Sequence, residues 1–281
     1  MNPEILNHLL SEEEKELFEQ NGFLIVPNAI PTEVVDNLNQ VVDRLEAERR
    51  VEQNLEPHTK IQYMDFIGRD AAFLELLDCP KTFGKVWGIL GWHIQLYHSH
   101  MLMTPPVPIE ERPQLKRLGW HQDTGQLNND LETTPRPRVS LKVGFFLTDT
   151  TDTNRGNFHV IPGSHLKNSI ELPDDGVSEP EGAIPVRVPP GTAVFFDRRL
   201  WHAGGHNTSD ITRKVLFYGY SYRWLKPRDD MTVAHYMERS DPIRRQLLGA
   251  GANYSFTSPR EEDVPLKTWL RDNLGEESLV L

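Results

Sequence analysis

The second half of the chain is a series of short apolar stretches, each ended by proline or glycine, and this pattern limits the possible folds most strongly. The stretches lie at about 92–106, 138–149, 157–165, 183–197 and 213–224. Short strands separated by turn residues at regular intervals are typical of a barrel or of a double-sheet jelly roll. The pattern therefore predicts a mainly β protein.

The first ninety residues carry helical signals instead. Ser11 and Glu14 form a capping-box pattern, and Gly22 follows eight residues after Glu14 as a stop signal. Further on, apolar residues recur at three- and four-residue intervals, as in an amphipathic helix. We predict helices at 11–21, 32–52 and 70–90, the last interrupted by Pro80, and a short buried strand at 23–27. The helices are expected to cover one sheet.

The length of 281 residues allows one domain with a full core. We predict a single domain over 1–281, with a helical part at about 1–90, a β core at about 92–225 and a C-terminal extension at about 226–281. The extension is charged and partly helical, and the sequence assigns it no role.

Composition excludes several functions. The net charge of −11 argues against nucleic acid as a partner, and the single cysteine, Cys79, rules out a disulfide framework or a cysteine-based metal site. The chain has no signal-peptide pattern and no apolar run long enough to span a membrane. We expect a cytoplasmic protein, a monomer or homodimer, that contacts no membrane and acts on a small molecule.

The stretch "GWHQDT" at 119–124 places His121 and Asp123 two residues apart in an extended segment. Residues i and i+2 of a strand point to one face, so both side chains would enter one space. A third ligand is available at His202, between two predicted strands. Two histidines and one carboxylate form the facial triad of non-haem Fe(II) oxygenases. A strand histidine and a turn aspartate making local hydrogen bonds is the alternative.

Three motifs together resemble the phytanoyl-CoA dioxygenase family of Fe(II)- and 2-oxoglutarate-dependent oxygenases. They are "HQD", "LTD…GNFHVIPGSH" and "WHAGGHNTSDITRK", and "GFLIVPNAI" is similar to the family's usual start. The resemblance covers about 15–225. It implies a double-stranded β-helix (jelly-roll, cupin-like) core, in which His121, Asp123 and His202 hold iron. It also implies that Arg213 binds the distal carboxylate of 2-oxoglutarate, where a surface ion pair with Asp210 is the alternative.

Two positions depart from the family's pattern. Family members often have a serine two residues after the distal histidine, and this chain has Gly204. Lys142 stands where many members have a small polar residue that faces the cosubstrate. It shares a strand face with Ser140 and Gly144, and a lysine there needs an anion unless it faces solvent. We therefore expect Lys142 to bind a carboxylate of the cosubstrate or the substrate.

His100 lies where family members contact 2-oxoglutarate, and we expect it to line the pocket. It shares a strand face with His98, and a second metal there is the alternative. Arg136 and Arg138 either meet an acidic substrate or offset the acidic loop before them.

The resemblance implies an oxygenase that uses Fe(II), 2-oxoglutarate and O2 and releases succinate and CO2. A carboxylate at Asp123, where halogenating relatives have a small residue, favours hydroxylation, desaturation, ring formation or C–N cleavage. A small metabolite, as in secondary metabolism, is the expected substrate. The alternatives are a cupin-like metalloenzyme that does not use 2-oxoglutarate, which would not need Arg213, and a macromolecule-modifying oxygenase or inactive binding module.

Overall fold

A capped helix opens the fold. The computed structural model describes residues 1–251 and 259–280, and the predicted extension over 226–281 is described except for 252–258 and 281. After η1 (Pro3–His8), helix α1 (Glu12–Asn21) begins with the predicted capping box, in which the Ser11 hydroxyl accepts from the Glu14 amide, and it ends at Gly22 in the left-handed conformation.

Two further helical regions confirm the prediction with one difference. Helix α2 (Thr32–Gln53) turns Val35, Leu38, Val42 and Leu45 toward the core. Pro80 does not interrupt a helix; it begins one, because proline suits the first helical position, where no amide donor is needed. The region therefore holds α3 (Ala71–Leu74) and α4 (Pro80–Leu90).

The strands form two antiparallel sheets within the described residues. The larger has six strands in the order β1-β7-β4-β9-β3-β2, and the smaller has three in the order β6-β5-β8. Their bounds are β1 (Phe23–Val26), β2 (Ile61–Met64), β3 (Ile94–Thr104), β4 (Ser140–Phe146), β5 (Phe158–Val160), β6 (Ile184–Val186), β7 (Ala193–Asp197), β8 (His202–Gly204) and β9 (Arg213–Tyr222). The sequence did not predict β2 or β8.

The larger sheet has two buried faces. Strand β4 alternates as predicted: Leu141, Val143 and Phe145 pack with the helices, whereas Lys142 points the other way and is only 4% exposed. A second apolar cluster, which includes Phe158 from the small sheet and Phe196 from the large one, fills part of the space between the sheets. The functional residues enter this space.

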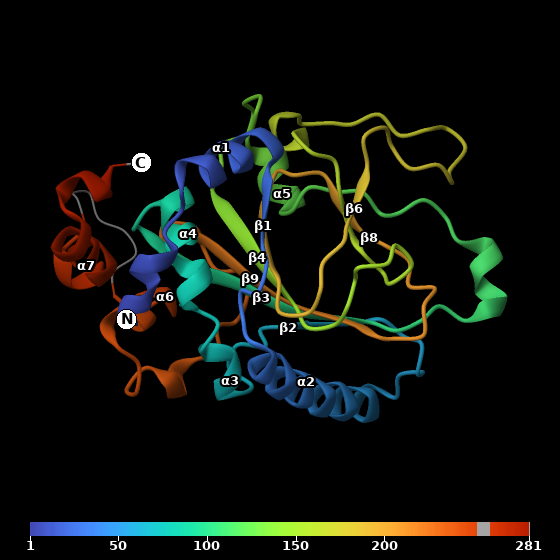
Figure 1. The fold of residues 1–281 in the computed structure, drawn as a ribbon, viewed down its shortest axis with the longest axis horizontal. Helices are drawn as coiled ribbons and strands as arrows, with labels where there is room; N and C mark the ends of the chain where they lie inside the picture. The colour runs from blue at the N-terminus through green and yellow to red at the C-terminus, as the bar shows by residue number, and fades with distance from the viewer. Residues whose placement is uncertain (252–258, 281) are drawn as a thin grey trace.

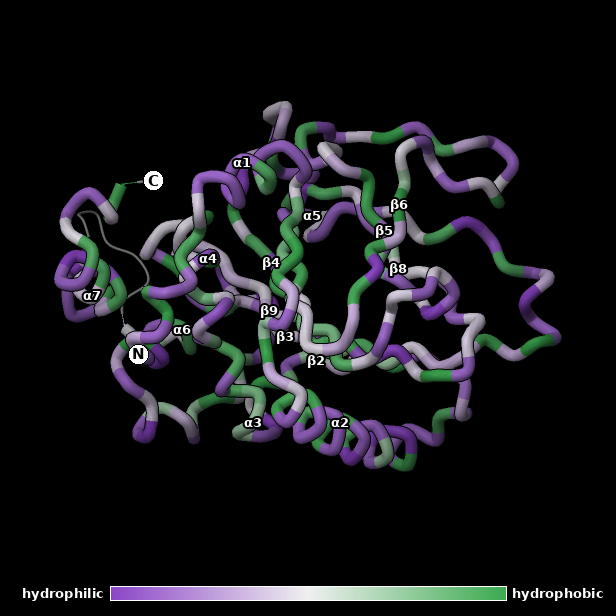
Figure 2. The backbone as a smooth tube through the Cα atoms, viewed as in Figure 1, coloured by the Kyte–Doolittle hydropathy of each residue, from purple (hydrophilic) through white to green (hydrophobic). Residues whose placement is uncertain are grey.

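In Figure 1, helices α3, α4, α6 (Pro242–Leu247) and α7 (Pro265–Leu274) lie to the left of the strands, and α2 lies below them. Helix α2 runs beside the sheet, and its tube in Figure 2 alternates between hydrophilic and hydrophobic colours, as expected for an amphipathic helix. The remaining short elements are η2 (Ile109–Gln114), α5 (Gly125–Asp130), η3 (Ser164–Leu166), η4 (Ala234–Tyr236), η5 (Glu261–Asp263) and η6 (Glu276–Leu279). In the described part of the chain, no helix combines the length and apolar character needed to cross a membrane.

Candidate active site

A backbone bridge brings the three predicted ligands together. The amide of His121 donates to the carbonyl of His202 at 3.0 Å, and the amide of His202 donates back at the same distance. Two residues on, the amide of Asp123 donates to the carbonyl of Arg198 at 2.9 Å. The chain around His121 thus runs beside β8, and His121 and Asp123 face the same space, as their spacing predicted.

The ligand atoms of His121, Asp123 and His202 all lie within 4.8 Å of one another. In both histidines Nδ1 lies 2.8 Å from a backbone carbonyl, that of Gly119 or of Leu200. A carbonyl only accepts, so each Nδ1 carries the proton and each Nε2 keeps a lone pair. Such outer hydrogen bonds are the usual way in which a metal-binding histidine is oriented.

The charges of this cluster also suit a divalent cation. Burial lowers the pKa of His202 to about 4, so the ring is neutral near pH 7 and able to act as a ligand. Burial opposes ionisation of Asp123, but the charge and hydrogen bond of Lys142, together with the neighbouring His202 and His121, outweigh burial and hold the pKa of Asp123 below its usual range. Oδ2 of Asp123 is buried and has no hydrogen-bond partner among the described residues. The donor set therefore fits a metal ion such as Fe(II).

Lys142 has a different partner from the one expected. Its Nζ lies 2.9 Å from Oδ1 of Asp123, and the two side chains are 5% and 7% exposed. The sequence argument held that this buried ammonium needs an anion, and Asp123 supplies one inside the protein. That argument therefore no longer requires a cosubstrate carboxylate beside Lys142.

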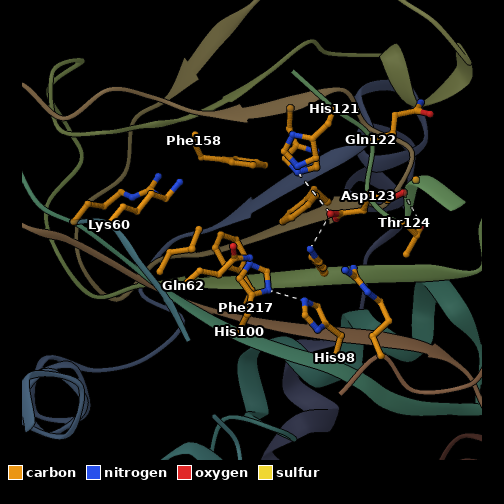
Figure 3. Close-up of a pocket in the computed structure, with 18 residues that line it drawn as sticks. Lys60, Gln62, His98, His100, His121, Gln122, Asp123, Thr124, Phe158 and Phe217 are labelled. Atoms are coloured by element: carbon orange, nitrogen blue, oxygen red, sulfur yellow. Dashed lines mark hydrogen bonds and ion pairs between the residues drawn. The ribbon is translucent and has the colours of Figure 1, made fainter. Parts of the chain in front are cut away.

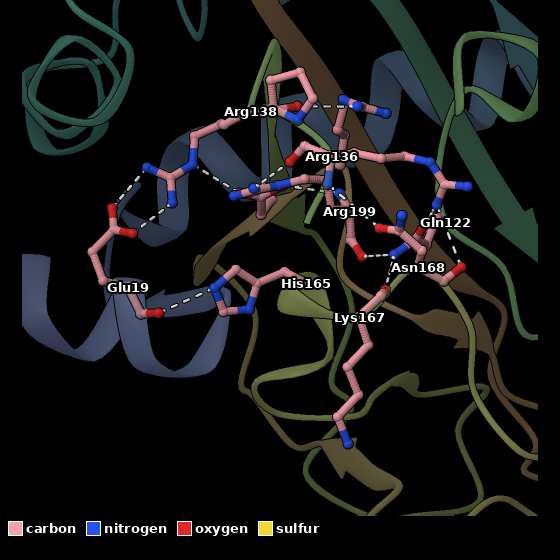
Figure 4. A network of polar contacts seen from close by, with 11 residues as sticks. Glu19, Gln122, Arg136, Arg138, His165, Lys167, Asn168 and Arg199 are labelled. Atoms are coloured by element: carbon pink, nitrogen blue, oxygen red, sulfur yellow. Dashed lines mark hydrogen bonds and ion pairs between the residues drawn. The ribbon is translucent and has the colours of Figure 1, made fainter. Parts of the chain in front are cut away.

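A polar network behind the site holds the 119–124 segment in place (Figure 4). The side-chain amide of Gln122 donates to the carbonyls of Lys167 and Arg199, and its oxygen accepts from Arg136 at 3.0 Å. Arg138 pairs with Glu19 and Asp197. Arg136 and Arg138 thus have partners inside the protein, and the acidic partners of Arg138 are Glu19 and Asp197 rather than the acidic loop before it.

Arg213 lines the cavity that His121, Asp123 and His202 also line, and it is 2% exposed. It therefore does not form the alternative ion pair with Asp210 at the surface. Burial lowers the pKa of Arg213 to about 10, which leaves it charged near pH 7. Its Nη atoms donate to the Gly156 carbonyl and the Thr104 hydroxyl, and its buried Nε has no hydrogen-bond partner among the residues that the structure describes. No acidic side chain lies within ion-pair distance of it in the described ranges. A buried charge of this kind calls for an anion.

Lys60 is the residue that sequence reasoning missed. It precedes β2 and lines the cavity with part of its side chain, although the residue as a whole is exposed. Desolvation of its ammonium, followed by the charge of Arg213, lowers the pKa of Lys60. A Cβ placed on Gly204 would lie 3.8 Å from Nζ of Lys60 and 4.0 Å from Nη2 of Arg213. The position without the family's serine is therefore flanked by two cations. Only Arg213 had a sequence signal, since Lys60 sits in no recognisable motif.

One cavity of about 350 Å³ is lined by the three ligand residues and by Lys60, Lys142 and Arg213 (Figure 3). Figure 3 shows His121 and Asp123 at one end and Lys60 at the other, with Phe158 and Phe217 between. His100 lines the cavity as expected, and its ring stacks on that of Phe217 with centroids 4.7 Å apart. A second cavity, of about 280 Å³, shares Thr124, Gly125 and Arg228 with the first.

Residues 18–215 match the model of the family described as "Phytanoyl-CoA dioxygenase (PhyH)". The chain belongs to the phytanoyl-CoA dioxygenase family. This confirms the family inferred from the motifs, that of Fe(II)- and 2-oxoglutarate-dependent oxygenases. The matched residues include every side chain discussed above from Lys60 to Arg213.

Individual relatives within and around this family are distant. An uncharacterized protein of Mycobacterium tuberculosis is 27% identical over 183 residues, 64% of this chain and 63% of the relative, so the alignment spans less than two thirds of that protein. The ectoine dioxygenase of Bordetella bronchiseptica is 25% identical over 241 residues, 75% of each chain.

Among solved structures, HygX from Streptomyces hygroscopicus with nickel and 2-oxoglutarate bound is 18% identical, with a TM-score of 0.61 over 78% of this chain and 90% of HygX. With the two facing antiparallel sheets, this similarity confirms the jelly-roll core expected for the phytanoyl-CoA dioxygenase family.

Proposed function

We propose that this protein is an Fe(II)- and 2-oxoglutarate-dependent oxygenase that hydroxylates an unactivated C–H bond of a small metabolite. One observation carries the proposal: a cavity brings three ligand atoms together at one end and, at the other, two cations that have no acidic partner among the described residues. A metal at the first end and a dicarboxylate reaching the second would satisfy both.

His121, Asp123 and His202 would hold the iron. When bound, Fe(II) with 2-oxoglutarate supplies the oxidising chemistry: 2-oxoglutarate, O2 and the substrate C–H give succinate, CO2 and the C–OH product. The similarity to HygX, whose structure has nickel and 2-oxoglutarate bound, supports this cofactor set.

The protein's own residues bind and orient the reactants. Arg213 and Lys60 would bind the carboxylate of 2-oxoglutarate that lies away from the metal, and Arg213 offers a planar pair of donors for it. Lys142 holds Asp123 in one orientation through their ion pair. Phe158, Phe196 and Phe217 line the cavity between the two ends and limit access of water.

The primary substrate would reach the metal from the second cavity, through the part that the two share at Thr124, Gly125 and Arg228. We propose a small metabolite handled in the cytoplasm, without nucleic acid or membrane as partner, because the chain is acidic. Use of Arg213 for a dicarboxylate distinguishes this function from that of a cupin-like metalloenzyme that does not need 2-oxoglutarate.

A metabolite screen coupled to succinate release tests the proposal. Purified protein with Fe(II), 2-oxoglutarate and O2 should release succinate in the presence of its substrate, and omission of any one of the three should stop release. His202→Ala serves as the inactive control. Turnover that continues in chelated protein, or without 2-oxoglutarate, would refute the proposed chemistry.

A further inference from the structure

A chain of hydrogen bonds leads from a buried carboxylate to the active-site cavity. Oδ1 of Asp229 lies 2.7 Å from Nδ1 of His98, and Nε2 of His98 lies 2.8 Å from Nδ1 of His100. The side chains of Asp229 and His98 are 1% and 2% exposed, and His100 lines the cavity (Figure 3). The function proposed above has not used Asp229 or His98.

The other oxygen of Asp229 fixes the direction of this chain. Oδ2 accepts from both the amide and the hydroxyl of Ser99. With its carboxylate held as an acceptor on that side, Asp229 accepts from His98 as well, so the proton of His98 lies on Nδ1. Burial lowers the pKa of His98, although the hydrogen bond to Asp229 acts in the opposite direction. Burial also holds the pKa of His100 well below its usual value.

The position of the proton on His98 determines the position of the proton on His100, because both imidazoles are neutral. Since His98 carries its proton on Nδ1, its Nε2 is an acceptor and takes a hydrogen bond from Nδ1–H of His100. Nε2 of His100 is then left with a lone pair. It has no hydrogen-bond partner among residues 1–251 and 259–280.

We propose that the Asp229–His98–His100 chain presents Nε2 of His100 to the cavity as a hydrogen-bond acceptor for an O–H or N–H group of the primary substrate. This inference rests on the proposed function and narrows its substrate class to molecules with such a donor. A lone pair at this position repels carboxylate oxygens, so His100 faces the primary substrate rather than 2-oxoglutarate, in contrast to its expected contact with the cosubstrate. Asp229 and His98 are positioning residues, because they act through His100.

Asp229→Asn offers a near-isosteric reversal of the chain. The amide of Ser99 can only donate, so it would keep the oxygen of the new side chain, and the NH2 group would then face His98. Nδ1 of His98 would become an acceptor, its Nε2 a donor, and Nε2 of His100 would carry a proton toward the cavity. The substitution changes the polarity of the site with little change in shape.

Long-range ¹H–¹⁵N NMR of protein with ¹⁵N-labelled histidine shows which ring nitrogen of His100 carries the proton, and it needs no substrate. The signals of His100 are assigned by their loss in His100→Gln, and circular dichroism checks that each variant is folded. We expect the Nδ1–H form of His100 in the wild type and the Nε2–H form in Asp229→Asn. A wild-type His100 with its proton on Nε2 would overturn the proposal, whatever the activity of the enzyme.

Succinate release provides the second readout, with pairs of hydroxy or amino metabolites and their O- or N-methyl analogues as probes. A substrate with a free donor should lose at least tenfold in kcat/KM on methylation in the wild type, and the loss should shrink in Asp229→Asn. An equal loss in both proteins would overturn the assigned role of His100. If no compound releases succinate, the proposed function itself fails, and the NMR result alone decides the polarity of the chain.

Discussion

Replacement of Lys142 by methionine tests which partner this lysine has. Its Nζ lies 2.9 Å from Oδ1 of Asp123, and both side chains are nearly buried. Removal of one member of a buried ion pair costs about 3–5 kcal/mol, because the other charge is left unpaired. At roughly 2–4 °C per kcal/mol for a chain of this size, the melting temperature should fall by roughly 6–20 °C.

Calorimetry in the presence of a chelator measures this loss, and a double-mutant cycle isolates the pair. The Lys142→Met/Asp123→Asn protein removes both charges and should be more stable than Lys142→Met alone. Added Zn(II) should stabilise Lys142→Met more than the wild type, since the metal replaces the lost positive charge beside Asp123. The reasoning fails if Lys142→Met keeps its stability within about 1 kcal/mol and instead raises the KM for 2-oxoglutarate tenfold, since Lys142 would then bind the cosubstrate, as the sequence suggested.

Other substitutions test the remaining parts of the site. Lys60→Met should raise the KM for 2-oxoglutarate about tenfold, equivalent to about 1.4 kcal/mol. Arg213→Met should raise this KM more, because Arg213 is buried. Steady-state kinetics measures both values, and a KM for Lys60→Met equal to that of the surface control Lys116→Met would refute the role of Lys60. Gly204→Ser should bind 2-oxoglutarate at least as tightly as the wild type by calorimetric titration, since its Cβ meets only ordinary contacts; weaker binding would mean that Lys60 and Arg213 do not flank the ligand. Metal-free protein should lose stability as the pH falls from about 6.5 toward 4, because the unfolded chain protonates His202 first. Denaturant titrations should show a flatter profile for His202→Gln, and an identical profile would contradict the low pKa.

The sequence predicted those features of the fold that depend on residues close together in the chain. The capping residues of α1 and the alternation along β4 are examples, and the latter correctly placed Lys142 on the inner face. Pro80 was assigned as a break because its meaning depends on whether a helix ends before it or starts at it.

Partners far apart in the chain were less predictable. Lys142 was expected to bind a carboxylate of the cosubstrate or the substrate, and the fold also brings the carboxylate of Asp123 to it from a loop outside the sheet. Asp229 and His98 are separated by 131 positions, and Lys60 joins Arg213 only after β2 has paired with β3 and β3 with β9. No periodicity or motif in a single sequence records such contacts.

Anaerobic titration of the protein with Fe(II) and then 2-oxoglutarate, followed by visible absorption, tests the central claim most directly. We predict one iron and one 2-oxoglutarate per chain and a charge-transfer band that appears only when both are present. The band should be absent in His121→Ala and should require more 2-oxoglutarate in Arg213→Met. A protein that binds no iron at this site, or whose spectrum does not respond to 2-oxoglutarate, would contradict the account.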